Sequence, residues 1–312
     1  MKKYFIKRLI QLPIILIGVL ICVFLIIQLT PGDPAATLAG PKAGQAEVEA
    51  VRRQLGLDRP IIVQFVDYVA NVLKGNFGRS YTHKTDISFG VLTALINTIY
   101  LMLFARIWSI LAAIPLGIYA ALRHNSWVDK ICMSVSLLGI SIPQFWLGLI
   151  LMKIFCFDLE ILPFSGMGDS FLSIDGVLHV ILPAFMLGLP QLASIARLTR
   201  SEMLEVMRQD YIKTALAKGV KRRMVIYKHA LKNASLPLIT VIGTQTGYML
   251  SGSVVIENIF AWPGLGRYSI QAIIGSDYPA IQASVLLFAV MFLVVNLLVD
   301  LAYGFVDPRI KY

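Results

Sequence analysis

Charged side chains are scarce in this sequence. They make up 15% of its 312 residues, while hydrophobic residues make up 57%. Soluble domains usually carry about a quarter charged residues. A chain this apolar cannot cover its surface with polar groups in water, so its composition predicts a protein whose main solvent is the lipid bilayer.

Cysteine and histidine are also few, and neither forms a metal-binding motif. The three cysteines show no C-x-x-C pair, and the four histidines show no H-x-x-x-H spacing. We therefore predict no metal site and no disulfide framework. These residues are Cys22, Cys132, Cys156, His83, His124, His179 and His229.

Motifs of catalysis are absent from the sequence. The chain has no G-x-x-x-x-G-K-[ST] loop for ATP, and no G-x-S-x-G or H-E-x-x-H motif for hydrolysis. We predict a protein that is not an enzyme, has no catalytic residue and binds no cofactor itself. The net charge of +10 does not indicate a nucleic-acid partner, because basic nucleic-acid-binding domains are not this hydrophobic.

Apolar runs of about 20 residues recur along the chain. The first is too long for the core of a signal peptide, so we interpret it as an uncleaved transmembrane helix. The sequence predicts an all-α, polytopic membrane protein with about six transmembrane helices. The predicted spans are 9–29, 97–121, 131–155, 178–197, 236–256 and 280–304, the fourth interrupted by Pro183 and Pro190.

Basic residues predict the orientation of these spans. Four Lys and Arg residues precede the first span, which places the N-terminus in the cytoplasm, and six crossings return the C-terminus, with Arg309 and Lys311, to that side. The region between the first two spans contains two short amphipathic patterns, typical of a small helical cap. The predicted parts are 1–30 (N-terminal tail and first helix), 31–96 (extracytoplasmic cap), 97–304 (transmembrane core, with a cytoplasmic segment at 198–235) and 305–312 (cytoplasmic C-terminal tail).

The segment at 198–235, called the basic segment below, is unusually rich in positive charge for this chain. Lys and Arg crowd its second half, and no acidic residue occurs between Asp210 and Glu257. These cations would set the topology and attract anionic lipid headgroups. Among them, the small residues around Thr214 and Gly219 would let another protein approach a short helix closely. We expect Asp210 to cap that helix, over 211–218, and Gly219 to end it, with a second helix from Lys221 to Asn233 leading into Pro237.

The stretch DYIKTALAKGVKRRMVIYKHALKNASLP, Asp210–Pro237, resembles the cytoplasmic coupling segment of ABC importer permeases in the peptide/nickel branch. Lys213, Thr214 and Ala215 take the E-A-A positions of that family, and Gly219 takes its glycine. The sequence departs from the general pattern at Lys213, but has the T-A-x-A-K-G and H-A-L-x-N-A elements common in the branch. Further blocks resemble the branch in the same order, among them Ser141–Leu151, Ile181–Val206, Val254–Ile273 and Asp300–Lys311.

This resemblance implies a type I ABC importer permease fold in the bacterial inner membrane. The expected partners are a second homologous permease subunit, cytoplasmic ATPase subunits that bind the ATP, an extracytoplasmic substrate-binding protein and membrane lipid. The implied substrate is nickel, as an ion or a chelate, or a small peptide. The wording ENIFAWPG is closer to nickel-type members, and a di- or oligopeptide permease is the alternative. The candidate residues for coupling to the ATPase are Asp210, Lys213, Thr214, Ala215, Lys218 and Gly219.

Two further features of the sequence each allow two interpretations. The turn ENIFAWPGLGRY either is a capped loop with Trp262 as an interface anchor, or belongs to an outer gate or binding-protein docking surface through Glu257, Trp262 and Arg267. Arg106 lies inside the second predicted span, where a central arginine costs about 2.5–3.5 kcal/mol. It either lines the translocation path or only shapes helix packing.

Two other classes of protein are alternatives to the permease. A gradient-driven secondary transporter or channel would often show inverted repeats and acids within its spans. Here no clear repeat is visible, and Asp300 is the only acid within a predicted span. A membrane-embedded enzyme is disfavoured by the missing catalytic motifs.

Overall fold

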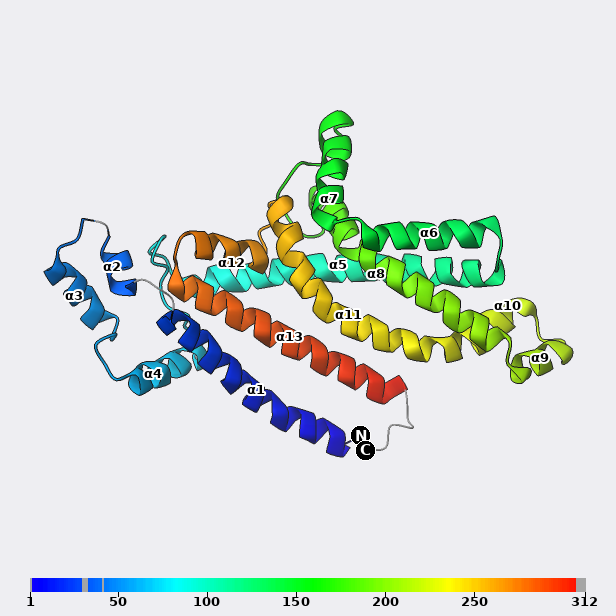
Figure 1. Cartoon of the computed structure of the whole chain (residues 1–312), viewed down its shortest axis with the longest axis horizontal. Coiled ribbons are helices and arrows are strands. Elements are labelled where there is room, and N and C mark those ends of the chain that lie inside the picture. Colours follow the sequence, from blue (N-terminus) through cyan, green and yellow to red (C-terminus); the bar gives the residue numbers. More distant parts are fainter. Residues whose placement is uncertain (1, 30–32, 41, 307–312) are drawn as a thin grey trace. The chain divides into compact units, whose positions relative to one another are not determined.

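The computed structural model describes residues 2–29, 33–40 and 42–306, and in these residues the regular elements are all helices (Figure 1). The predicted all-α class is therefore confirmed. Most of the predicted C-terminal tail, with Arg309 and Lys311, lies outside the described residues, as does the side chain of Asp300. The helices are α1 (Lys2–Leu29), α2 (Pro34–Ala39), α3 (Gln45–Gln54), α4 (Ile61–Leu73), α5 (Ile87–Leu122), α6 (Trp127–Ser141), α7 (Gln144–Met152), the π-helix η1 (Lys153–Asp158), α8 (Ile174–Met207), α9 (Asp210–Ala217), α10 (Arg222–Met224), the π-helix η2 (Val225–Ala230), α11 (Leu231–Ile259), α12 (Leu265–Ile274) and α13 (Tyr278–Val306).

Four of the helices are long and apolar enough to cross a membrane, within α5, α8, α11 and α13. They coincide with the second, fourth, fifth and sixth predicted spans. The fourth is one continuous helix despite its two internal prolines. The described apolar part of α1, Ile10–Leu25, is shorter than a span. The count of six spans therefore stays a prediction.

The third predicted span is not a straight helix. Its residues form the pair Trp127–Gly139 and Gln144–Asp158, which are bent by 101° relative to each other. The bend falls at Ile142, whose backbone is extended, and at Pro143 after it. A residue before proline is pushed out of the helical region, which gives the break a local cause.

The chain forms two compact units. Among the described residues, the core unit comprises 99–262 and 295–306, and the cap unit comprises 2–29, 33–40, 42–98 and 263–294. In the core unit, α8 packs on α6, α7 and α11. It also approaches α5 closely, since a Cβ added to Gly117 would lie 2.6 Å from the Ala196 carbonyl oxygen. Small residues of this kind allow membrane helices to pack tightly.

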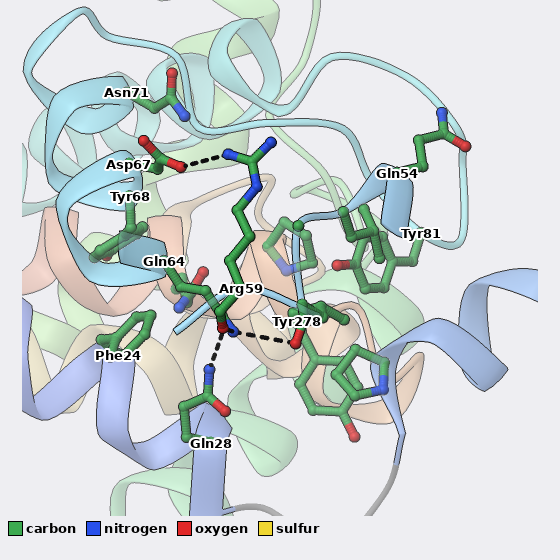
Figure 2. Close-up of a pocket in the computed structure, with 16 residues that line it drawn as sticks. Phe24, Gln28, Gln54, Arg59, Gln64, Asp67, Tyr68, Asn71, Tyr81 and Tyr278 are labelled. Atoms are coloured by element: carbon green, nitrogen blue, oxygen red, sulfur yellow. Dashed lines mark hydrogen bonds and ion pairs between the residues drawn. The ribbon is translucent and has the colours of Figure 1, made fainter. Parts of the chain in front are cut away.

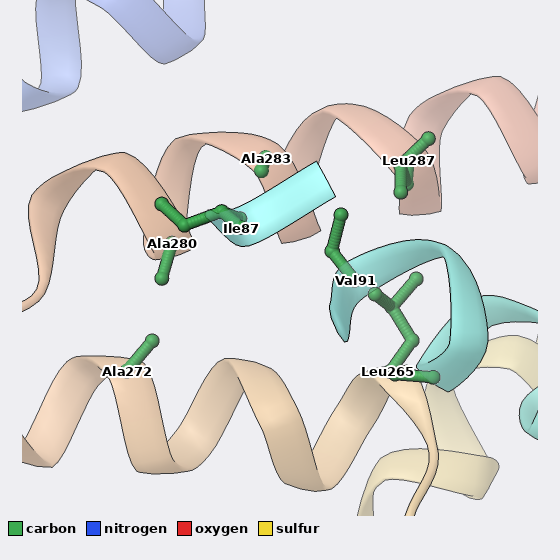
Figure 3. Close-up of a cluster of buried hydrophobic side chains, with 8 residues drawn as sticks. Ile87, Val91, Leu265, Ala272, Ala280, Ala283 and Leu287 are labelled. Carbon is green, nitrogen blue, oxygen red and sulfur yellow. The ribbon is translucent and has the colours of Figure 1, made fainter. Parts of the chain in front are cut away.

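The cap unit has its own apolar centre, where the start of α5 meets α12 and α13 (Figure 3). Ile87, Val91 and Leu265 are fully or almost fully buried there. A polar contact supports the same junction, because the Thr98 hydroxyl accepts a hydrogen bond from the Leu265 N–H at 2.8 Å. These contacts hold the turn before α12 against α5.

The predicted cap region contains helices α3 and α4, where the two amphipathic patterns lie, and a third short helix, α2. The Asp33 side chain caps α2 by accepting from the Ala35 N–H at 3.0 Å. Arg52 of α3 donates to the same carboxylate at 2.6 Å. Asp33 thereby links α2 to α3.

Candidate coupling site

The short helix α9 ends in a tight glycine turn. Gly219 has a φ of +77°, in the left-handed region that glycine adopts at little cost. Its N–H donates to the Leu216 carbonyl at 3.0 Å, and the Val220 N–H donates to the Ala215 carbonyl at 3.2 Å. This is the hydrogen-bond pair of a Schellman motif, so Gly219 ends the helix as predicted.

The start of α9 differs from the prediction. Asp210 lies inside the first turn, the capping position belongs to Gln209, and no side chain caps the helix. Asp210 pairs instead with Lys213 at 2.8 Å, with side chains 93% and 68% exposed. A pair this exposed contributes little stability, although an acid in the first turn favours the helix dipole.

One face of α9 is anchored in the core unit. Ile212 is fully buried in a cluster with Ile118 of α5, Met203 of α8 and Val225 of η2. Ala215 is half-buried and packs against the same cluster. The helix is therefore held to the ends of three other elements, so a force on α9 acts directly on the packed core.

The opposite face of α9 is open. Thr214, Lys218 and Gly219 are exposed, so the structure places most of the predicted coupling residues at the surface. Ala215 is the exception, because it turns toward the cluster. Sequence reasoning missed two apolar side chains on this helix, Tyr211 and Leu216, which are 43% and 45% exposed. The sequence signal that could have revealed them is the position of these large side chains between basic residues along the chain.

The chain after α9 also departs from the prediction. In place of one helix ending before Pro237, the structure has α10, then the π-helix η2, and then α11, which runs on through Pro237. Proline removes one backbone hydrogen bond, and helices in membrane bundles tolerate this where neighbours satisfy the freed carbonyl. The basic segment is thus continuous with the fifth predicted span.

Arg106 lies half-buried in the core unit. Its Nη2 donates to the Thr246 hydroxyl of α11 at 2.7 Å, while its buried Nε and Nη1 have no hydrogen-bond partner among the described residues. An arginine that keeps free N–H groups inside a helical bundle can bind an anion or water there. The contact with Thr246 fixes its direction toward α11.

The turn after α11 is packed inside the protein. Glu257 and Trp262 are each 0% exposed. The Trp262 ring stacks on Tyr100, with centroids 6.0 Å apart and planes inclined by 12°. This burial does not fit an anchor at the membrane interface. Arg267, in the first turn of α12, is half-buried.

A chain of long apolar helices, with one short exposed helix set among cations between two of them, has the architecture of a membrane transport subunit. Residues 113–312 match the family described as the binding-protein-dependent transport system inner membrane component, and residues 1–113 match the N-terminal part of such membrane components. The chain belongs to this family, and it is an ABC importer inner-membrane permease of the peptide/nickel branch.

The chain is also similar over its whole length to permeases with named substrates. It is 42% identical to the glutathione transport system permease protein GsiC of Salmonella typhimurium, across 100% of both chains. The proteins of the same name from Pectobacterium atrosepticum and Escherichia coli K12 are 41% and 40% identical, again over 100% of each chain.

Proposed function

We propose that this permease imports short peptides of the glutathione class. The observation that carries the proposal is the similarity to glutathione permeases, at 40–42% identity across the full length. The similarity favours the peptide alternative of the sequence analysis over nickel, because none of the relatives named above is a nickel permease. Because the chain belongs to the ABC importer family, a gradient-driven transporter and a membrane-embedded enzyme are no longer needed to explain its sequence.

The chain would work as one membrane subunit of a larger machine. An ABC importer of this family combines its permease with ATPase subunits and a binding protein. The proposed partners of this chain are a second homologous permease, cytoplasmic ATPases that hold the ATP, an extracytoplasmic binding protein and the surrounding lipid. Both termini would lie in the cytoplasm.

The exposed face of α9 is the proposed contact with the ATPase. Three observations support it: the buried anchor Ile212, the small exposed surface around Thr214 and Gly219, and the apolar side chain of Leu216 beside it. Apolar side chains surrounded by polar ones are common at the centre of protein interfaces. Closure of the ATPase pair would push on α9, and the Ile212 cluster would transmit that push to α5, α8 and α11.

Two further roles are proposed for the predicted residues. Arg106 would face the translocation path, where its unpaired N–H groups could meet a substrate carboxylate. Glu257 and Trp262, being buried, suit an outer gate better than a docking surface for the binding protein. Arg267 is retained as a candidate for the docking surface.

Uptake by the complete complex in proteoliposomes tests the proposed substrate. The complex of both permeases, ATPases and binding protein is given ATP and, in separate runs, radiolabelled glutathione, a labelled dipeptide or radioactive nickel. We expect ATP-dependent uptake of the peptides, glutathione foremost, and none of nickel. ATP-dependent uptake of nickel without uptake of either peptide would overturn the proposal.

A further inference from the structure

The cap unit contains a cavity, open on one side, that the coupling function does not use. Its volume is about 340 Å³, and it lies where the end of α1, the α3–α4 region and the start of α13 meet (Figure 2). A second hollow of about 550 Å³ shares several of its walls. Sites for small molecules commonly measure about 300–1,000 Å³. The side chains common to both hollows include Gln54, Tyr68, Asn71, Tyr81 and Gln282.

The side-chain amide of Gln64, whose oxygen and NH₂ group are both hydrogen-bonded, fixes one wall of the cavity. Gln64 of α4 accepts a hydrogen bond from Gln28 of α1 at 3.0 Å (Figure 2). Its own NH₂ group donates to the Leu57 and Arg59 carbonyls at 3.2 and 2.8 Å. These three bonds join α1, the α3–α4 turn and α4, so this wall is already formed.

Asp277, just before α13, positions a second part of the lining through Tyr81. Its carboxylate is buried and accepts from the Ser80 hydroxyl and from the Tyr81 N–H, the latter at 3.1 Å. The two bonds place Tyr81 beside Tyr278, with ring centroids 6.4 Å apart. Both rings line the cavity.

Several polar groups of the lining are unpaired. The side-chain amides of Gln54, Asn71 and Gln282 make no hydrogen bond within the described part of the chain, and the Tyr68 hydroxyl is buried without a partner. Burial raises the pKa of Tyr68 to about 12, so the hydroxyl stays protonated and available as a donor. Gln54 and Asn71 are exposed and Gln282 is half-buried, so the cost of a missing partner falls on the buried Tyr68 hydroxyl, and a ligand that supplies a partner removes that cost.

The chemistry of this lining matches a short peptide. Each free amide offers both donors and an acceptor, as the peptide bond requires. At the edge of the cavity, Arg59 and Asp67 pair at 3.1 Å while both remain more than half exposed, so a cation and an anion are within reach of charged peptide ends. Aromatic rings add apolar contact area. A lipid tail would leave the free amides unpaired.

We propose that this cavity binds the transported peptide as it passes from the binding protein to the translocation path. The proposal rests on the function proposed above, since it assigns a site to that substrate. The named groups that would hold the peptide are Tyr68, Asn71 and Gln282. Tyr68 and Asn71 lie on α4 and Gln282 lies on α13, far away in the sequence, so the site exists only in the folded cap unit.

Direct binding of radiolabelled glutathione tests the site. The complex of both permeases with the ATPases, in nanodiscs without the binding protein, is titrated by equilibrium dialysis. Tyr68→Phe and Gln282→Leu should each weaken binding about tenfold, the loss expected for one buried hydrogen bond. Tyr248→Phe is the matched control, because Tyr248 is 75% exposed on α11 and lies outside both hollows. Tyr68→Phe should not lower the thermal midpoint, because the lost hydroxyl has no partner in the protein.

The outcomes separate this site from the proposed function. If the complete complex imports glutathione but dialysis finds no saturable binding, or equal binding by all variants, the cavity assignment is wrong and the function stands. If no peptide is imported at all, the proposed function fails. A photoreactive residue at Asn71 that labels glutathione supports the site, while one that labels only lipid overturns it.

Discussion

Arg200 of α8 donates hydrogen bonds to both carboxylate oxygens of Asp129 of α6, from Nε at 2.5 Å and from Nη2 at 2.6 Å. Asp129 is almost fully buried and also accepts from the Asn125 N–H at 3.0 Å. A two-point pair of this kind fixes geometry as well as charge. It ties α6 to the last turns of α8, shortly before the chain enters α9.

Asp129→Asn should destabilise the core unit strongly. Removing one partner of a buried ion pair leaves the other charge uncompensated, and the typical cost is about 3 kcal/mol. We expect a clear drop in the thermal midpoint of the purified chain in detergent. Asp158→Asn is the control, since its pair with Lys153 has side chains 43% and 69% exposed and should cost less than about 1 kcal/mol. Equal effects of the two variants would show that the Asp129 pair does not support the fold.

Two residues of α9 should separate anchoring from docking. Ile212→Ala removes a fully buried side chain and should destabilise the chain by about 2–5 kcal/mol. Leu216→Ala, on the exposed side, should leave the thermal midpoint unchanged but weaken co-purification of the ATPase subunits by about tenfold. Thermal melting and quantitative pull-down check the pair. Normal ATPase recovery with Leu216→Ala would remove that residue from the interface.

Arg106 should be reachable from water during transport. In a variant whose three native cysteines are replaced by serine, Arg106→Cys should react with a membrane-impermeant thiol reagent in at least one state of the ATP cycle. The control is Ala105→Cys, because Ala105 is fully buried beside it. Labelling is read by mass spectrometry with and without ATP. Absence of labelling at 106 in every state would reduce Arg106 to a packing role beside Thr246.

Patterns that depend on a few neighbouring residues were predictable from the sequence. The apolar runs gave four long helices at the expected places, and the small residues before Gly219 gave a short helix ending at that glycine. The family resemblance rested on ordered motifs along most of the chain, and the comparisons confirm it. These features are local, so a single sequence carries them.

Several features of the structure differ from the prediction or were missed by it. Asp210 was expected to cap α9 but lies within it, and the helix through Pro237 was expected to stop. The 101° bend at Pro143 was also missed, although the residue before a proline is a known helix boundary. The cavity of the cap unit combines α1, α4 and α13, and no sequence period reveals that combination.

Gly219 offers the most direct test of coupling through α9. A Cβ at this position would meet no atom of the chain, and asparagine tolerates the left-handed backbone, so Gly219→Asn should fold. Gly75→Asn is the matched control, with a φ of +72° and open space in a different part of the chain. Any common effect of the substitution itself will appear in both variants.

The measurement is glutathione uptake per ATP hydrolysed, by the complete complex in proteoliposomes. If α9 docks on the ATPase through its small surface, Gly219→Asn lowers this ratio at least about tenfold, the effect of a disrupted interface residue, while Gly75→Asn leaves it unchanged. An unchanged ratio in Gly219→Asn, with an unchanged thermal midpoint, would contradict the account, because Gly219 would then serve only to end the helix.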